Sequence, residues 1–213
     1  MTPQVIDLSS NNGTSINFNK VAAAGVREVF IRTSMGYGCK DKDCEILAEA
    51  ADKAGLPVNY YHFSYPDKKS GNGTVDSDAT AEADYFCDTI QSMPKYTRIA
   101  IDCERFNATS DTPLTASEYT EWLSTFLDHV YARTGVQCLL YGTADYLNHK
   151  LVDNHGLADK CSLWLANYNN ISSPPIPKGF STYTLWQYSE SGSVDGIAGH
   201  VDSSLFNPAN SVA

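Results

Sequence analysis

The residues best placed for chemistry are two carboxylates, Asp102 and Glu104, at the end of the apolar run RIAIDCE. Side chains alternate along a β-strand, so both acids share one face while Cys103 takes the other. At about 3.3 Å per residue, the two acids lie roughly 6–7 Å apart along the backbone. This spacing suits an acid/base pair at a glycosidic bond, and it falls between the retaining and inverting separations, so both outcomes stay open. Repulsion between the two acids raises the pKa of one of them and keeps a proton available near neutral pH.

Two further acids lie on strands that a closed barrel brings beside this pair. Asp7 follows the apolar residues of a first strand over 4–8, and Asp202 lies in a last strand around 200–203. In a barrel the first and last strands are neighbours, and catalytic residues gather at the carboxyl ends of the strands. We therefore predict that four carboxylates meet at one rim. Such a cluster suits an oxocarbenium-like transition state or, alternatively, a divalent metal. Taken alone, the pair Asp102 and Glu104 (the DxE pair) also fits a solvated strand end.

Aromatic and amide side chains occupy the ends of the other predicted strands. Tyr and Trp rings can stack on sugar faces, although about half of the rings on a strand point out of a barrel. Asn and Gln side chains can hydrogen-bond to acetamido or hydroxyl groups. His62 lies at a strand end, where it fits a supporting role better than that of a metal ligand. The candidate substrate-binding residues are Tyr61, His62, Tyr141, Trp164, Asn167, Tyr168, Trp186 and Gln187.

The elements that must position these residues alternate between β-rich runs and helical stretches, which is typical of a parallel sheet with crossover helices. Strands are predicted at 4–8, 28–34, 57–63, 98–104, 136–142, 162–168, 182–189 and 200–203. Helices are predicted at 17–24, 44–54, 78–91 and 115–133. In the last third the strands come close together, and the proline-rich run SSPPIPKG is expected to be an ordered loop. The predicted fold is α/β, an irregular TIM-barrel-like (β/α) barrel of about eight strands with fewer helices.

Composition excludes several classes of function. Fifteen basic and 25 acidic residues among 213 give a formal net charge of −10. An acidic chain gains nothing from counterion release, so we expect no nucleic-acid partner. No run approaches the roughly 18 apolar residues of a membrane span, so no membrane insertion is expected. Residues 1–7 lack the basic start and apolar run of a secretory signal.

We expect one domain over residues 1–207 and a tail or linker stub over 208–213. Four of the six cysteines sit in apolar runs and are predicted to be small core residues. Cys39 and Cys44 flank the loop CKDKDC and are able to pair if oxidised. The cysteine spacings do not resemble a zinc site, and no metal or other cofactor is predicted.

Taken together, these segments resemble glycoside hydrolase family 25, the Chalaropsis-type lysozymes that include many phage endolysin domains. The matching blocks, in chain order, are IDLSSNNG, FIRTSMGYG, AGLPVNYYHF, IDCE, LWLANY and LWQYSESGSVDGIAGHVD. The resemblance implies an irregular (β/α) barrel that hydrolyses the β-1,4 bond between N-acetylmuramic acid and N-acetylglucosamine. The implied partner is bacterial peptidoglycan, with a C-terminal wall-binding domain as a possible addition.

The resemblance also implies residue roles. Glu104 corresponds to the general acid, and Asp102 to a carboxylate that assists the oxocarbenium ion or the acetamido group of the substrate. Asp7 and Asp202 correspond to the other acids of the cleft. Tyr61 and Tyr141 correspond to rings that help position the substrate. Since the target lies outside the membrane, the chain is expected to be a phage enzyme made in the host cytoplasm or a secreted protein whose signal has been trimmed.

One departure from the family pattern leaves alternatives open. Some members carry Lys-x-Ser/Thr-Glu after the second strand, where this chain has Arg32 and Met35. The loss of that Glu motivates a second hypothesis, a peptidoglycan-binding module without catalysis. A third hypothesis is a metal-dependent carbohydrate deacetylase that uses Asp7, His62 and Asp102.

Overall fold

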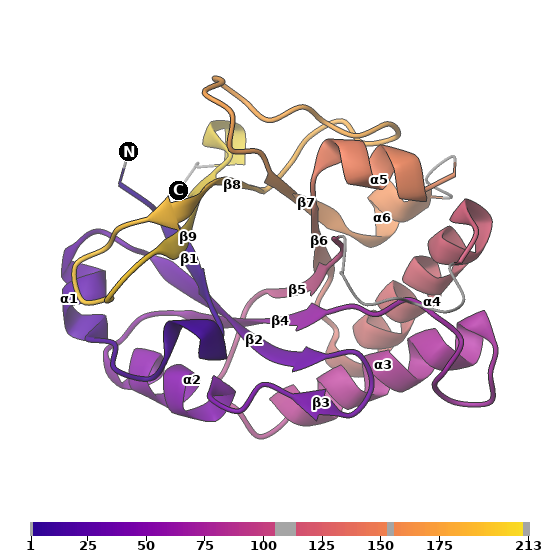
Figure 1. The fold of residues 1–213 in the computed structure, drawn as a ribbon, viewed down its shortest axis with the longest axis horizontal. Coiled ribbons are helices and arrows are strands. Elements are labelled where there is room, and N and C mark those ends of the chain that lie inside the picture. Colours follow the sequence, from indigo (N-terminus) through magenta and orange to yellow (C-terminus); the bar gives the residue numbers. More distant parts are fainter. Residues whose placement is uncertain (1, 105–113, 153–155, 211–213) are drawn as a thin grey trace.

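Eight strands form the barrel of the computed structural model, which describes residues 2–104, 114–152 and 156–210. The barrel strands are β1 (Val5–Leu8), β2 (Glu28–Met35), β4 (Val58–Phe63), β5 (Ile99–Asp102), β6 (Cys138–Gly142), β7 (Ser162–Ala166), β8 (Leu185–Gly192) and β9 (Val201–Phe206). The sheet closes because β1 pairs with both β2 and β9. A short strand, β3 (Cys39–Lys40), adds an antiparallel partner to the end of β2. Figure 1 looks into the resulting ring of strands.

Two connections without a helix make helices fewer than strands: residues 167–184 join parallel β7 and β8, and a short loop joins β8 to the last strand. Barrel neighbours run parallel from β1 through β2 to β8, whereas β9 is antiparallel to both β8 and β1. Parallel neighbours need a crossover connection, but antiparallel neighbours are joined by a short loop. Residues 193–200 therefore link β8 to β9 without a helix. The predicted barrel of about eight strands with fewer helices is confirmed.

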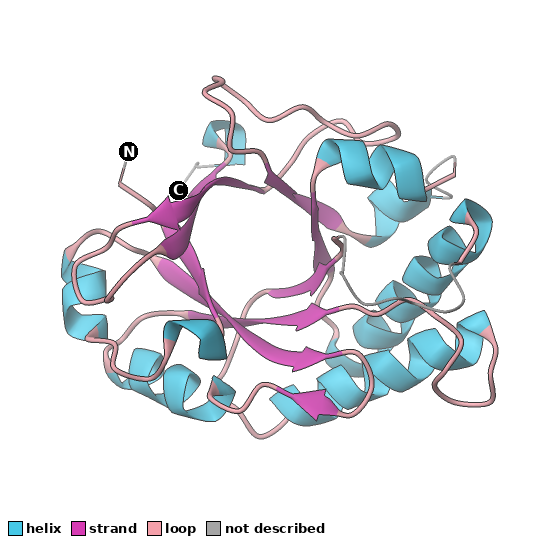
Figure 2. Ribbon diagram, viewed as in Figure 1, coloured by secondary structure: helices cyan, strands magenta, loops and turns pink. Residues whose placement is uncertain are grey.

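The helices of the described residues lie outside the ring, as Figures 1 and 2 show. They are α1 (Phe18–Ala23), α2 (Cys44–Lys53), α3 (Val75–Ile90), α4 (Ala116–Thr134), α5 (Ala144–Lys150) and α6 (Leu157–Lys160). The last two were not predicted, because elements this short show too little hydrophobic periodicity. None of these helices combines the length and apolarity that a membrane crossing requires.

Side-chain caps fix the ends of the two long helices. In α4 a capping box is present: the Thr115 side chain accepts from the backbone N–H of Glu118, and the Glu118 side chain accepts from the backbone N–H of Thr115. The same helix ends at Gly135 in the left-handed conformation, as expected of a C-terminal glycine. In α3 a second capping box, between Thr74 and Ser77, starts the helix three residues before its predicted start.

Strand alternation divides the apolar side chains into two cores. The larger core lies between the strands and the helices, and α3 and α4 contribute much of it. The smaller core lies inside the barrel and consists of Val5, Phe30, Ala100, Leu139, Tyr141, Trp164, Ala166 and Leu185. These inner residues fill the barrel, as in other barrels of this width, and leave only the rim open for a site.

Phe126 on α4 offers a test of the larger core. Its fully buried ring stacks on Trp122 at 5.4 Å and on His62 at 5.3 Å between ring centres. We expect Phe126→Ala to lower the free energy of unfolding by about 3–5 kcal/mol, because it leaves a cavity in a packed interface. Urea denaturation measures the loss. The control is Tyr131→Ala, an exposed ring on the same helix, which should change stability by less than about 0.5 kcal/mol. Equal losses would contradict the packing assigned here.

Candidate active site

The carboxyl ends of the barrel strands surround a cavity of about 210 Å³. All eight barrel strands contribute to its wall. The lining residues are Asp7, Ser9, Asn11, Arg32, Tyr61, Phe63, Ala100, Asp102, Glu104, Tyr141, Trp164, Tyr168, Gln187, Glu190 and Asp202. Five of these are carboxylic acids, and Arg32 is the one cation among the described lining residues. The cavity is therefore an acidic groove at the mouth of the barrel.

Nine of the twelve residues singled out in the sequence line this cavity. They are Asp7, Asp102, Glu104, Asp202, Tyr61, Tyr141, Trp164, Tyr168 and Gln187. The structure thus brings together the four acids whose convergence the chemistry required. Glu104 lies two residues beyond β5 rather than within a strand, yet Cys103 still points into the outer core and the two acids still share the cavity.

The other three candidates, His62, Asn167 and Trp186, do not line the cavity. Each one alternates with a lining neighbour on the same segment and so faces the helices or solvent. His62 is fully buried against the rings of α3 and α4. The indole N–H of Trp186 donates to the carbonyl of Asn167 at 2.9 Å, and the Asn167 side chain accepts from the backbone N–H of Asn169 at 3.0 Å. The prediction that these three side chains lie in the groove is corrected.

Asp7 and Asp202 form a carboxyl pair across two strands. They are direct cross-strand partners in the β1–β9 register, so their carboxyl groups lie side by side, and a proton on one of them relieves their mutual repulsion. Burial, and then the charge of Asp202, raise the pKa of Asp7 well above its ordinary value. Partial burial, and then the charge of Glu190, raise the pKa of Asp202 to about 6. This corner of the groove therefore binds a proton at pH values where isolated carboxyls do not.

Asp102 lies deep in the groove and has one free acceptor. The residue is 7% exposed, and its Oδ1 is the one buried polar side-chain atom among the described residues without a hydrogen-bond partner. Burial, followed by the charges of Glu104 and Asp7, raises the pKa of Asp102 well above its usual range, while Arg32 opposes the shift. A buried polar atom without a partner is rare in folded proteins, and at a residue that lines a cavity it points to a functional role.

Glu104 stands at the solvent-accessible mouth of the same groove. Partial desolvation, and then the charges of Asp202 and Glu190, raise the pKa of Glu104. A carboxyl group that is accessible and keeps its proton to higher pH is suited to general acid catalysis. The two acids of the DxE pair thus differ in position, because one is buried and the other is exposed.

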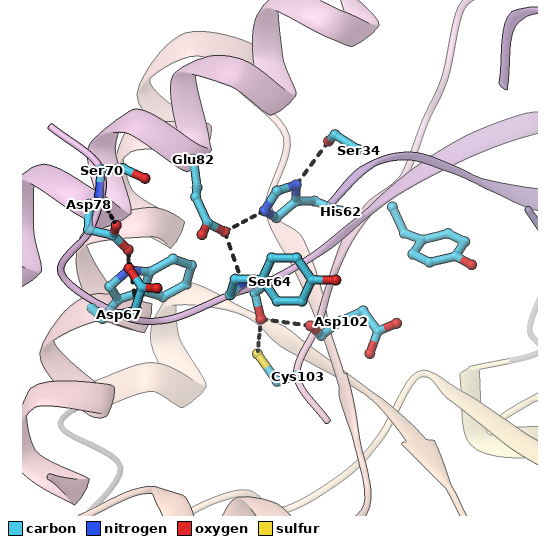
Figure 3. A network of polar contacts seen from close by, with 12 residues as sticks. Ser34, His62, Ser64, Asp67, Ser70, Asp78, Glu82, Asp102 and Cys103 are labelled. Atoms are coloured by element: carbon cyan, nitrogen blue, oxygen red, sulfur yellow. Dashed lines mark hydrogen bonds and ion pairs between the residues drawn. The ribbon is translucent and has the colours of Figure 1, made fainter. Parts of the chain in front are cut away.

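Ser64, just after β4, fixes the backbone of Asp102 from behind the groove. Its backbone N–H and its hydroxyl both donate to the Asp102 carbonyl, at 3.1 and 2.7 Å. Figure 3 shows this contact beside the pair formed by His62 and Glu82, which lies on the side of α3. The two ring nitrogens of His62 contact Ser34 at 2.9 Å and Glu82 at 2.8 Å. His62 therefore supports the strand that carries the groove residues and does not reach the groove itself.

The loop after β4 is anchored to α3 by buried carboxylates. Glu82 also accepts from the backbone N–H of Tyr65 at 3.1 Å. Asp78 accepts from the backbone N–H groups of Asp67 and Ser70 and from the indole of Trp122, as drawn in part in Figure 3. These contacts hold in place the loop that contains Ser64, and through it Asp102.

Gln187 organises the opposite wall of the groove. Its amide nitrogen donates to Asp7 at 2.9 Å. Its amide oxygen accepts from the hydroxyls of Tyr141 at 2.8 Å and Tyr168 at 2.6 Å. The indole N–H of Trp164 donates to Ser204 at 3.1 Å. The polar wall is thus a connected set of hydrogen bonds that orients one carboxyl and two tyrosines toward the cavity.

Two charged lining residues were not predicted as site residues. Arg32 was noted only as a departure from a family pattern, yet its guanidinium reaches the groove and binds the buried Asp41 at 3.0 Å. Glu190 comes from a segment of β8 in which the register is irregular, and strand alternation alone does not place it in the groove. Met35, at the position where some family members carry Glu, is not among the lining residues.

The metal-dependent hypothesis required His62 to join Asp7 and Asp102. The structure places His62 on the other face of β4, so that donor set does not assemble. Within residues 2–104, 114–152 and 156–210, no group of three or more His, Cys, Asp or Glu residues has a metal-binding arrangement. The six cysteines are free thiols.

Comparison with known sequences decides the family. The sequence pattern of "Glycosyl hydrolases family 25" matches residues 6–197. The chain belongs to this family. It is therefore a glycoside hydrolase, and the family resemblance read from its motifs is confirmed.

Alignments with three relatives cover nearly the whole of this family 25 chain. Lysozyme M1 of Streptomyces globisporus is 32% identical over 208 residues, which are 96% of this chain and 67% of that protein. An N,O-diacetylmuramidase of Chalaropsis sp. is 25% identical over 221 residues, with 97% of each protein covered. The crystal structure of a lysozyme from Streptomyces coelicolor has a TM-score of 0.83 at 31% identity and covers 97% of this chain and 93% of its own.

The carboxyl pair formed by Asp7 and Asp202 leads us to predict how the free energy of unfolding depends on pH. Because the pKa of Asp202 is about 6 in the folded chain, against an ordinary value of 3.8, the folded state binds its proton more tightly. Stability therefore falls as pH rises from about 4 through 6. We expect the free energy of unfolding of Asp202→Asn to exceed that of the wild type by about 1 kcal/mol at pH 8, after allowance for solvent screening. At pH 4 the two free energies of unfolding should be equal.

Urea denaturation at the two pH values measures this difference. The control is Asp195→Asn, which removes an exposed acid paired with Lys20 and should change stability by less than about 0.5 kcal/mol at either pH. A variant Asp202→Asn that is less stable than the wild type at pH 8 would contradict the assignment.

Proposed function

We propose that this family 25 hydrolase cleaves the β-1,4 bond between N-acetylmuramic acid and N-acetylglucosamine in bacterial peptidoglycan, with Glu104 as the general acid. The observation that carries the proposal is the meeting of exposed Glu104 and buried Asp102, with its unpaired oxygen, in one cavity. The names of the relatives, a lysozyme and an N,O-diacetylmuramidase, support this choice of substrate.

In this proposal Glu104 donates its proton to the glycosidic oxygen as the bond breaks. Asp102 acts in its ionised form and stabilises positive charge on the sugar or orients the acetamido group. The two acids titrate together, because a charge on one raises the free energy of ionising the other. Arg32 opposes the upward shift of the Asp102 pKa, and positive charge that develops on the sugar favours the ionised form of Asp102 further. The productive state in this proposal is the one with the proton on Glu104 and the charge on Asp102.

Asp7 and Asp202 complete the negative wall of the groove. Together with Asp102 they favour a transition state that carries positive charge over a neutral ground state. In this proposal Tyr141, Tyr168 and Gln187 form the wall that positions the substrate, and partly exposed Tyr61 contacts a sugar face. Trp164 is buried against Phe30 and Tyr141 and supports the base of the cavity. The same wall contributes aromatic surface and hydrogen-bonding groups, the combination that carbohydrate binding requires.

The Glu104→Gln variant tests the assignment. We expect the release of reducing ends from purified peptidoglycan to fall by about 10²–10⁴-fold, because Gln has the shape of Glu but no acidic proton. Mass spectrometry of wild-type fragments should show muramic acid at the new reducing ends.

The matched control is Glu121→Gln, the same change at an exposed position on α4, which should retain wild-type activity. Undiminished clearing of cell walls by Glu104→Gln would end the general-acid assignment. Wild-type chain that binds the walls but releases no reducing ends would favour the binding-module hypothesis instead.

A further inference from the structure

Glu190 reaches the groove only because β8 is irregular. Gln187 faces the cavity, so a regular strand would turn residue 190, three positions later, to the opposite face. The register between β8 and β9 shifts twice, between Gln187 and Ser189 and again between Ser189 and Gly192. Each shift places one more residue on β8 than on β9, which is a β-bulge, and bulges re-aim side chains beside functional sites. Glu190 accordingly lines the cavity.

The same register sets Glu190 beside the carboxyl pair. Ser189 pairs with Ser203 and Gly192 pairs with Val201, so Asp202 is the β9 residue that faces the bulged segment. On its other side Asp202 pairs with Asp7. Carboxyl groups therefore form a row across the adjacent strands β1, β9 and β8.

Glu104 lies close enough to this row to respond to its charge. The groups that raise the pKa of Glu104 are, after desolvation, Asp202 and Glu190. The charged and titratable groups that line the cavity around Glu104 are Asp7 from β1, Arg32 from β2, Tyr61 from β4, Asp102 from β5, Tyr141 from β6, Tyr168 after β7, Glu190 from β8 and Asp202 from β9. Because Arg32 is bound to Asp41, the groove keeps an excess of negative charge.

We propose, on the basis of the function proposed above, that Glu190 is a positioning residue for proton donation: its carboxylate acts through space on Glu104 and helps it keep the proton that it delivers. Glu190 itself transfers no proton and forms no bond to the sugar. The Glu190 side chain is exposed at the mouth of the groove, where Glu104 is also accessible. The bulges in β8 are the structural device that places this charge.

The test is the pH profile of Glu190→Gln, measured as reducing ends released at substrate concentrations well below saturation. A general acid works only while protonated, so activity falls as pH rises through the pKa of Glu104. Removing the Glu190 charge should move the midpoint of this alkaline limb about 0.5 pH unit lower. The variant should therefore be about three-fold less active than the wild type above the midpoint and equal to it below.

Three comparisons separate this effect from a change in structure. Glu190→Asp keeps the charge and should keep the wild-type limb. Glu121→Gln removes the same charge from exposed α4 and should not move it. The difference in the midpoint of the alkaline limb between Glu190→Gln and the wild type should become smaller at about 0.5 M salt, because salt screens charges at a solvent-accessible mouth.

Two outcomes overturn the proposal. One is a pH profile of Glu190→Gln that coincides with that of the wild type. The other is an equal loss of activity at every pH, caused by a higher KM, which would make Glu190 a substrate contact. Neither outcome touches the role of Glu104, provided that Glu104→Gln remains inactive. Full activity of Glu104→Gln would instead show that the failure lies in the proposed function.

Discussion

Repulsion between carboxyl groups held in one cavity is the constraint on which this structure depends. Closing the barrel pairs β1 with β9 and sets Asp7 directly opposite Asp202. The wall then adds Asp102 from β5, with Glu104 and Glu190 at the mouth. Burial penalises the charged form of each acid, and in this poorly solvated space like charges also repel strongly, so the groups bind protons and their pKa values rise. The same repulsion that disfavours folding at high pH supplies the protonated acid that glycosidic cleavage requires.

The barrel withstands this repulsion because the acids are fixed from outside the groove. Ser64 holds the carbonyl of Asp102 with two hydrogen bonds, and buried Glu82 and Asp78 on α3 hold the loop that carries Ser64. On the opposite wall Gln187 holds Asp7. The larger core, on the outer side of the strands, stabilises the fold by apolar packing that does not depend on the groove. A functional site that lowers stability is in this way supported by a core that restores it.

Strand alternation explains both the correct and the incorrect site predictions. Asp102 and Glu104 were placed on one face by the period of two, and both line the cavity. The same period, carried through each strand from a lining residue, places His62, Asn167 and Trp186 on the other face. Their residue types suited a sugar site, but residue type says nothing about which face a side chain takes. His62 nevertheless contributes, since its contacts with Ser34 and Glu82 tie two strands to α3.

The sequence by itself determined the caps of α4 and the DxE pair, because each depends on neighbours within a few residues along the chain. It also determined the order of the barrel elements and the family, because both depend on short local patterns and their order along the chain. Tertiary structure decided the antiparallel direction of β9, the bulges that turn Glu190 into the groove and the pairing of Arg32 with Asp41. Register and strand direction are set by hydrogen bonds to a neighbouring strand, and salt bridges by groups brought close only on folding. Sequence spacing carries no direct measure of either, so these features became visible only in the folded chain.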